Sequence, residues 1–210
     1  GTDICLTTES YLFRRTRCDL PTNALNKMFL MLHREIVRYD GTEDDYVEKF
    51  KYALLSKKER ARFPDDVEFK VAFEERPVYL MNSKNKIYIL ERFENFGTSE
   101  DKDVYRHCDD GTYSIEHIMP QHLTPVWQKE LGDDYEQIHE EWLHRMANLT
   151  LTAYNSKYNN SSFTEKKTMQ NGFDDSGIRM NTWIAKKNKW TLAELEERSE
   201  YLMSRALSIW

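Results

Sequence analysis

Two short strand-like segments, in a chain otherwise patterned for helices, restrict the possible fold most strongly. Residues 113–121 form a β-prone run that carries Glu116 and His117 side by side and is then stopped by a proline. Residues 148–152 (Asn-Leu-Thr-Leu-Thr) alternate polar and apolar side chains, as a half-buried strand does. Asn155 and a short helix signal follow. The sequence therefore predicts an α+β, mostly helical protein with one strand pair followed by a short helix.

The remaining chain carries helix signals. Phe63-Pro64-Asp65-Asp66 reads as a stop followed by a new helix cap, and Ser162–Glu165 and Thr191–Glu194 read as capping boxes. The acidic run at residues 100–103 is expected to be a loop, and residues 109–111 a turn. Helices are predicted from an N-cap at Thr22 to about residue 37, over residues 46–55, 66–73, 125–131 and 134–146, within 77–95, after Ser162, and from Thr191 to about Ile209.

Composition is that of an ordinary soluble globular protein, with 40% apolar and 31% charged residues. No stretch approaches the roughly 18 apolar residues that a membrane span needs, and the first residues do not resemble a secretory signal. The three cysteines, Cys5, Cys18 and Cys108, form no C-x-x-C pair, which favours free thiols in a reducing cytoplasm. A cytoplasmic protein without a membrane partner is expected. Because the chain begins with Gly1, we also expect it to be the tail of a longer protein.

Charge is unevenly distributed along the chain. The net charge is −6, but residues 145–210 contain ten Lys/Arg and seven Asp/Glu, a balance of +3 that leaves −9 for the rest. Positive potential next to the strand pair permits an approach to phosphates. Lys157, Lys166 and Lys167 are candidate DNA phosphate contacts, and an ordinary solvated face is the alternative. For Arg198, an ion pair on a surface helix is the expectation.

The residue types near the strands suit phosphodiester hydrolysis. A neutral histidine such as His117 can take a proton from water. A carboxylate and an amide oxygen, from Glu116 and Asn155, are ligands that a hard divalent cation prefers. Neighbouring strand residues point to opposite faces, so the strand is expected to end or bulge at Glu116 and His117. Asn148 is expected to hold the His117 backbone across the loop.

One competing metal motif is excluded by spacing. His139 and His144 flank a segment with two glutamates on a predicted helix, but they are five positions apart (i, i+5) rather than four (i, i+4). On a helix of 3.6 residues per turn they diverge by about 140° and cannot bind one metal together. These two histidines are therefore interpreted as structural. His122 is interpreted as structural as well.

The linked motifs Ile115-Glu116-His117-Ile118-Met119-Pro120-Gln121, Asn148-Leu149-Thr150-Leu151-Thr152, Asn155-Ser156 and Ser161–Lys167 resemble the C-terminal HNH domain of the GmrSD-type restriction endonucleases. The similarity extends upstream to Arg14-Arg15 and Cys18–Asn23 and downstream to Trp190-Thr191, Arg198 and Ile209-Trp210. Two departures are visible: Ala147 stands where the family usually has Gly, and no cysteine pairs brace the site.

The resemblance implies a ββα-metal (HNH) core over residues 111–172, with a helical lobe of the same domain over 1–110 and a helical extension over 173–210. It implies that His117 is the general base, Glu116 and Asn155 are metal ligands, and Asn148 is the middle Asn of the motif. Mg²⁺ is the implied cofactor, with Mn²⁺ as an alternative. The implied partners are DNA, including modified phage DNA, and an N-terminal NTPase-like domain or subunit that this chain does not contain.

Two functions from different classes follow. The first is a metal-dependent DNA endonuclease, the nuclease module of a phage-defence restriction system. The second is a non-catalytic module that binds DNA or a partner protein on the same fold. The complete set of Glu116, His117 and Asn155 favours the enzyme, and RNA as the substrate stays open.

Overall fold

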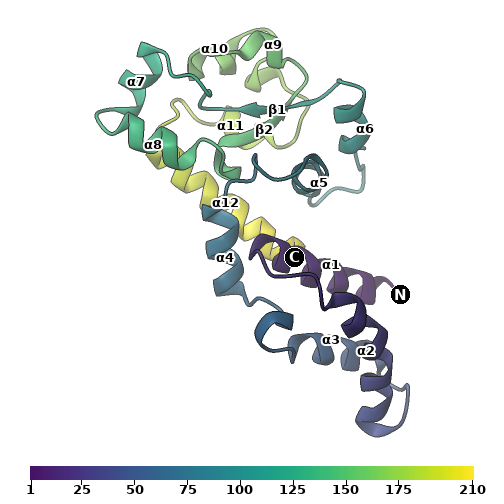
Figure 1. Ribbon diagram of the computed structural model, residues 1–210. Coiled ribbons are helices and arrows are strands. Elements are labelled where there is room, and N and C mark those ends of the chain that lie inside the picture. Colours follow the sequence, from purple (N-terminus) through teal and green to yellow (C-terminus); the bar gives the residue numbers. More distant parts are fainter. The chain divides into compact units, whose positions relative to one another are not determined.

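The computed structural model describes all 210 residues and is mostly helical, with twelve α-helices and a single two-stranded antiparallel sheet (Figure 1). The chain forms two compact units. The first contains residues 1–73 and 207–210, and the second contains residues 74–206. The predicted mostly helical fold with one small sheet is confirmed. No helix combines the length and apolar character needed to cross a membrane.

The first unit is entirely helical. Its elements are α1 (Thr2–Arg17), α2 (Leu25–Asp40), α3 (Tyr46–Leu55), the 3₁₀ turn η1 (Glu59–Ala61) and most of α4 (Asp66–Glu75). The N-cap of α2 is Ala24, so the predicted N-cap at Thr22 is wrong. The predicted start of α4 is confirmed, because the Asp65 carboxylate accepts a hydrogen bond from the Glu68 amide. The buried core of this unit consists of Tyr11, Leu32, Ile36, Phe50 and Leu54.

The second unit contains the strands and the remaining helices. Its helical elements are α5 (Ser83–Glu94), α6 (Val104–Asp109), α7 (Pro125–Leu131), α8 (Tyr135–Trp142), η2 (Met146–Asn148), α9 (Asn155–Tyr158), α10 (Phe163–Thr168), η3 (Phe173–Asp175), α11 (Asn181–Ala185) and α12 (Leu192–Ile209), the last of which ends in the first unit. α5 begins only at Ser83 because Asn82 caps it. α6 was not predicted; Asp103, at the end of the acidic loop, caps it.

The sheet pairs β1 (Ser114–His117) with β2 (Leu149–Thr152), so that Glu116 lies opposite Thr150 and His117 opposite Leu149. All four residues of β2 are buried, which corrects the prediction of a half-buried strand. The polar face is covered because the Thr150 hydroxyl donates to the Asn181 side chain. The apolar core of this unit includes Ile118, Met119, Trp127, Phe163 and Trp190.

α10 begins at a capping box and is followed by a tight turn. The predicted capping box is confirmed, with Ser162 and Glu165 exchanging side-chain and backbone hydrogen bonds. Just after the helix, a Cβ on Gly172 would lie 2.5 Å from the Lys166 carbonyl oxygen. Only glycine lets the chain turn this tightly against the end of α10.

Candidate active site

β1 ends at His117, and the Asn148 side chain holds the backbone just beyond it. The Asn148 side-chain oxygen accepts from the Met119 amide at 2.8 Å, and its Nδ2 donates to the Met119 carbonyl at 2.9 Å. The Ile118 amide donates to the Asn148 carbonyl. Asn148 is fully buried. It therefore acts across the loop as expected, but it holds residues 118 and 119 rather than His117 itself.

A polar hollow of about 250 Å³ lies at this strand end. Glu116 and His117 both line it, although neighbouring strand residues face opposite sides, because β1 stops at His117. Asn155, the first residue of α9, also lines the hollow, and its Nδ2 lies 3.5 Å from the Ile115 carbonyl oxygen. The other lining residues are Tyr79, Ile115, Pro120, Gln121, His122, Asn159 and Asn160.

Glu116 is buried and paired with Lys166. The ammonium of Lys166 lies 2.6 Å from Glu116 Oε1 and also donates to the carbonyls of His117 (2.9 Å) and Ile118 (3.1 Å). Both side chains are almost completely inaccessible. Burial raises the pKa of Glu116 and lowers the pKa of Lys166, while their pairing opposes both shifts.

The expectation that Lys166 contacts DNA phosphate is therefore corrected, because the side chain is buried. A fully buried ammonium that already donates to three protein oxygens does not face the solvent where a DNA phosphate would arrive. Its position instead joins α10 to the end of β1. Lys157 is exposed, with its ammonium 5.9 Å from the Tyr154 ring centroid, and Lys167 donates to the Lys187 carbonyl.

His117 belongs to a small ring cluster that the sequence did not reveal. Its Nε2 lies 3.1 Å from Nδ1 of His144. The Tyr79 ring contacts His117 edge-on at 4.4 Å and stacks on His144 at 5.2 Å, while the Tyr79 amide donates to the His144 carbonyl. His144 lies beyond the end of α8 at Trp142, so the predicted helix over 134–146 is too long. His139 instead contacts the Pro120 carbonyl.

The electrostatic surroundings favour a neutral His117. Burial lowers the pKa of His117 to about 3, and His144, Lys166, His139 and Lys86 act in the same direction. The imidazole therefore carries a lone pair at neutral pH. Since Nε2 is engaged by His144 and Nδ1 makes no hydrogen bond within the protein, Nδ1 is the nitrogen available for chemistry.

The oxygen donors at the hollow suit a hard divalent cation. Glu116 Oε2 accepts no hydrogen bond from the protein, and amide groups of Asn155, Asn159 and Asn160 line the same space. No group of three or more His, Cys, Asp or Glu side chains is arranged so that it could hold a metal ion by itself. One carboxylate and an amide oxygen fit Mg²⁺, which keeps several water or phosphate ligands.

Arg198 is buried rather than exposed, so the expected surface ion pair is wrong. Its side chain is 1% exposed, and Nη1 donates to the carbonyls of Ala147 (2.8 Å) and Leu149 (2.7 Å), on either side of Asn148. The Trp190 indole also donates to the Asn148 side chain. The far end of the chain thus supports the loop that positions the strand end.

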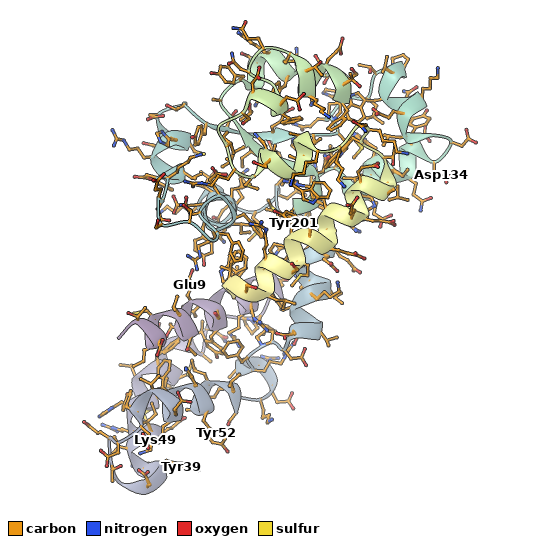
Figure 2. The ribbon with its side chains drawn as sticks, turned by 180° about the vertical axis from the view of Figure 1, so that it is seen from behind. Glu9, Tyr39, Lys49, Tyr52, Asp134 and Tyr201 are labelled. Atoms are coloured by element: carbon orange, nitrogen blue, oxygen red, sulfur yellow. The ribbon has the colours of Figure 1, made fainter.

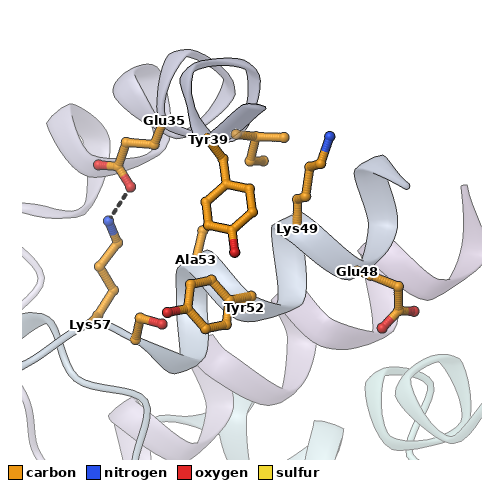
Figure 3. Close-up of a pocket in the computed structure, with 9 residues that line it drawn as sticks. Glu35, Tyr39, Glu48, Lys49, Tyr52, Ala53 and Lys57 are labelled. Carbon is orange, nitrogen blue, oxygen red and sulfur yellow. Dashed lines mark hydrogen bonds and ion pairs between the residues drawn. The ribbon is translucent and has the colours of Figure 1, made fainter. Parts of the chain in front are cut away.

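A separate hollow of about 450 Å³ lies between α2 and α3 in the first unit. Figure 3 shows Tyr39 and Tyr52 side by side within it and the ion pair between Glu35 and Lys57 at its edge. None of the predicted site residues lines this hollow.

The family match covers both strands and all the predicted site residues. Residues 63–205 match the family described as GmrSD restriction endonucleases, C-terminal domain. No curated protein matches the sequence. The resemblance indicated by the motifs is confirmed: this chain belongs to the family of GmrSD restriction endonuclease C-terminal domains.

Proposed function

We propose that this chain is a metal-dependent DNA endonuclease of the HNH type, the nuclease module of a restriction system that acts on phage DNA. Its family is one of restriction endonucleases, which makes DNA the expected substrate. The observation that carries the finer proposal is that Glu116, His117 and Asn155 line one polar hollow. β1, β2 and α9 would form the ββα-metal core.

His117 acts as the general base in this proposal. If its Nε2–H donates to His144 Nδ1, the Nδ1 lone pair is free to take a proton from the attacking water. His144 is then a positioning residue that sets the tautomer of His117. The lowered pKa keeps the base unprotonated across the neutral range.

Glu116 Oε2 and the Asn155 side-chain oxygen would hold the divalent ion, with Mg²⁺ or Mn²⁺ as candidates. Bound there, the ion supplies positive charge to the phosphate and the leaving oxygen. Lys166 keeps the Glu116 carboxylate in place through Oε1, and Asn148 holds the loop after His117. Lys157 and Lys167 stay as candidate phosphate contacts. The NTPase-like partner is a further proposal that rests on the family resemblance. The cytoplasmic location is also a proposal, and it rests on the three free cysteines.

Plasmid and phage DNA, with and without modified bases, provide the substrate for the test. The chain, or the longer protein that contains it, should cut with Mg²⁺ or Mn²⁺ and not with EDTA. His117→Ala should abolish cleavage, whereas His33→Ala should not, because His33 belongs to the other unit and does not line the hollow. Equal cleavage by His117→Ala would disprove the assignment of the base.

The alternative is a module that binds DNA or a partner without cutting. The pairing of Glu116 with Lys166 is the observation in its favour, because a carboxylate neutralised by an ammonium attracts a cation less strongly. Retention of DNA by an electrophoretic shift, with no cleavage under any divalent ion even with the partner domain present, would support this reading against the enzyme.

A further inference from the structure

A second hollow in the unit of residues 74–206 has the composition of an anion site. It measures about 400 Å³ and lies where α12 approaches α11 and the end of α5. It shares no lining residue with the hollow at His117. Figure 2 labels Tyr201 on α12, one of the residues that line it. Four cationic side chains line it: Arg179, Lys186, Arg198 and Arg205.

Arg198 carries an uncompensated charge beside this space. Its Nε and Nη2 are buried and have no hydrogen-bond partner, and only Nη1 is used by the carbonyls around Asn148. Burial lowers the pKa of Arg198 to about 9. Since buried guanidinium groups without partners are costly, the field of this group favours an anion in the adjoining hollow.

The only carboxylate that lines the hollow is already neutralised. Glu94 is fully buried, pairs with Lys102 at 2.7 Å, and accepts from the backbone amides of Arg179 and Met180. Four cations against one carboxylate leave +3 among the lining residues, in a chain whose net charge is −6. The positive potential is therefore a local feature of this hollow.

Aromatic rings also line the hollow. Trp183 stacks on Tyr201 with ring centroids 5.5 Å apart. The Arg205 guanidinium lies 4.6 Å from the Tyr201 centroid and 4.9 Å from that of Phe96. Cations beside flat aromatic faces are what a phosphate joined to a planar base requires. The volume also lies in the range of small-molecule sites, about 300–1,000 Å³.

We propose that this hollow binds a nucleotide, with the phosphate held by Lys186 and Arg205 in the field of Arg198 and the base against Trp183 and Tyr201. The nucleotide is either free or a unit of a nucleic-acid strand. The site is distinct from the proposed catalytic hollow. Arg198 lines this hollow and also contacts the support of the catalytic one, because its Nη1 holds the backbone on both sides of Asn148.

Calorimetric titration of the full 210-residue chain tests the proposal. The ligands are 5′-AMP, adenosine, inorganic phosphate and a 5′-phosphorylated single-stranded oligonucleotide, in EDTA and in the His117→Ala background. Cleavage then plays no part, so the outcome is independent of the proposed nuclease activity. We expect 5′-AMP to bind at least about tenfold more tightly than adenosine, because charged hydrogen bonds to the phosphate are strong.

The variant Lys186→Gln/Arg205→Gln should weaken 5′-AMP binding at least about tenfold. Lys129→Gln/Lys189→Gln, which removes the same charge from exposed positions outside the hollow, should bind as the parent chain does. If the oligonucleotide displaces bound 5′-AMP, the site takes a unit of a nucleic-acid strand. If the oligonucleotide does not displace 5′-AMP, the site takes a free nucleotide. No binding of 5′-AMP at millimolar concentration, or equal binding by the two double variants, would overturn the proposal.

Discussion

Replacing Lys166 by Met removes a buried charge while keeping side-chain length and helix propensity. In the parent chain the ammonium neutralises Glu116 and donates to the carbonyls of His117 and Ile118. The variant would leave the carboxylate, whose side chain is 5% exposed, and two carbonyls without their donor. The cost thus arises from groups that stay behind, not from the lysine itself.

Breaking a buried ion pair by removing one partner costs about 3–5 kcal/mol. The free energy of unfolding of a typical domain is about 5–15 kcal/mol, so Lys166→Met should be severely destabilised. With a urea slope of about 2 kcal/mol per molar, the midpoint should fall by about 2 M. Burial raises the pKa of Glu116, and loss of Lys166 raises it further. The folded state then binds more protons than the unfolded state, so the deficit should shrink as the pH is lowered toward 5.

Urea unfolding followed by circular dichroism measures this effect. The matched control is Lys167→Met, because the neighbouring ammonium is only partly buried and contacts one carbonyl; it should change stability by less than about 1 kcal/mol. Glu116→Gln in the Lys166→Met background should recover part of the loss, since it removes the unpaired charge. A Lys166→Met loss no larger than that of the control, with no dependence on pH, would show that the buried pair with Glu116 does not stabilise the fold.

Two further predictions concern the site and the thiols. His144→Ala should lower kcat of DNA cleavage about 10- to 100-fold with little change in KM, and His144→Asn should restore part of it by accepting from His117; an unchanged kcat would remove the positioning role. Burial, assisted by Glu91 and Asp110, raises the pKa of the Cys108 thiol to about 11. The alkylation rate of Cys108 should therefore rise about tenfold per pH unit between pH 8 and 10, whereas exposed Cys5 should be alkylated already at pH 8. Mass spectrometry of the labelled peptides measures both rates, and labelling of Cys108 before Cys5 would contradict the prediction.

Elements that begin with a strong local signal were predicted well. The Ser162 capping box starts α10, Thr124 caps α7, and the apolar spacing of residues 46–55 matches α3. These signals act within one helical turn, so the local sequence contains them completely. Helix ends were predicted less well: α8 stops at Trp142 because the following residues turn toward the sheet, where His144 meets His117.

Some residues of the candidate site could likewise be predicted from the local sequence, and others could not. The acid–histidine pair, its place at the end of a strand and the later Asn155 could be predicted because strand alternation and a stop signal are local. The contact of the Lys166 side chain with Glu116 could not be predicted, because a lysine in the first turns of a helix is usually solvated. Arg198 was misplaced for the same reason, because a polar residue on an amphipathic helix is expected to face water.

A mostly helical chain, a single strand pair that carries Glu116 and His117, and membership of the restriction endonuclease family all follow from the sequence alone. The three-dimensional fold is needed to show which groups surround that pair. Lys166 lies 50 residues from Glu116 along the chain, and His144 lies 27 residues from His117. Periodicity states which face of an element is buried, but the partner of a buried polar group is chosen by distant elements that fold against it.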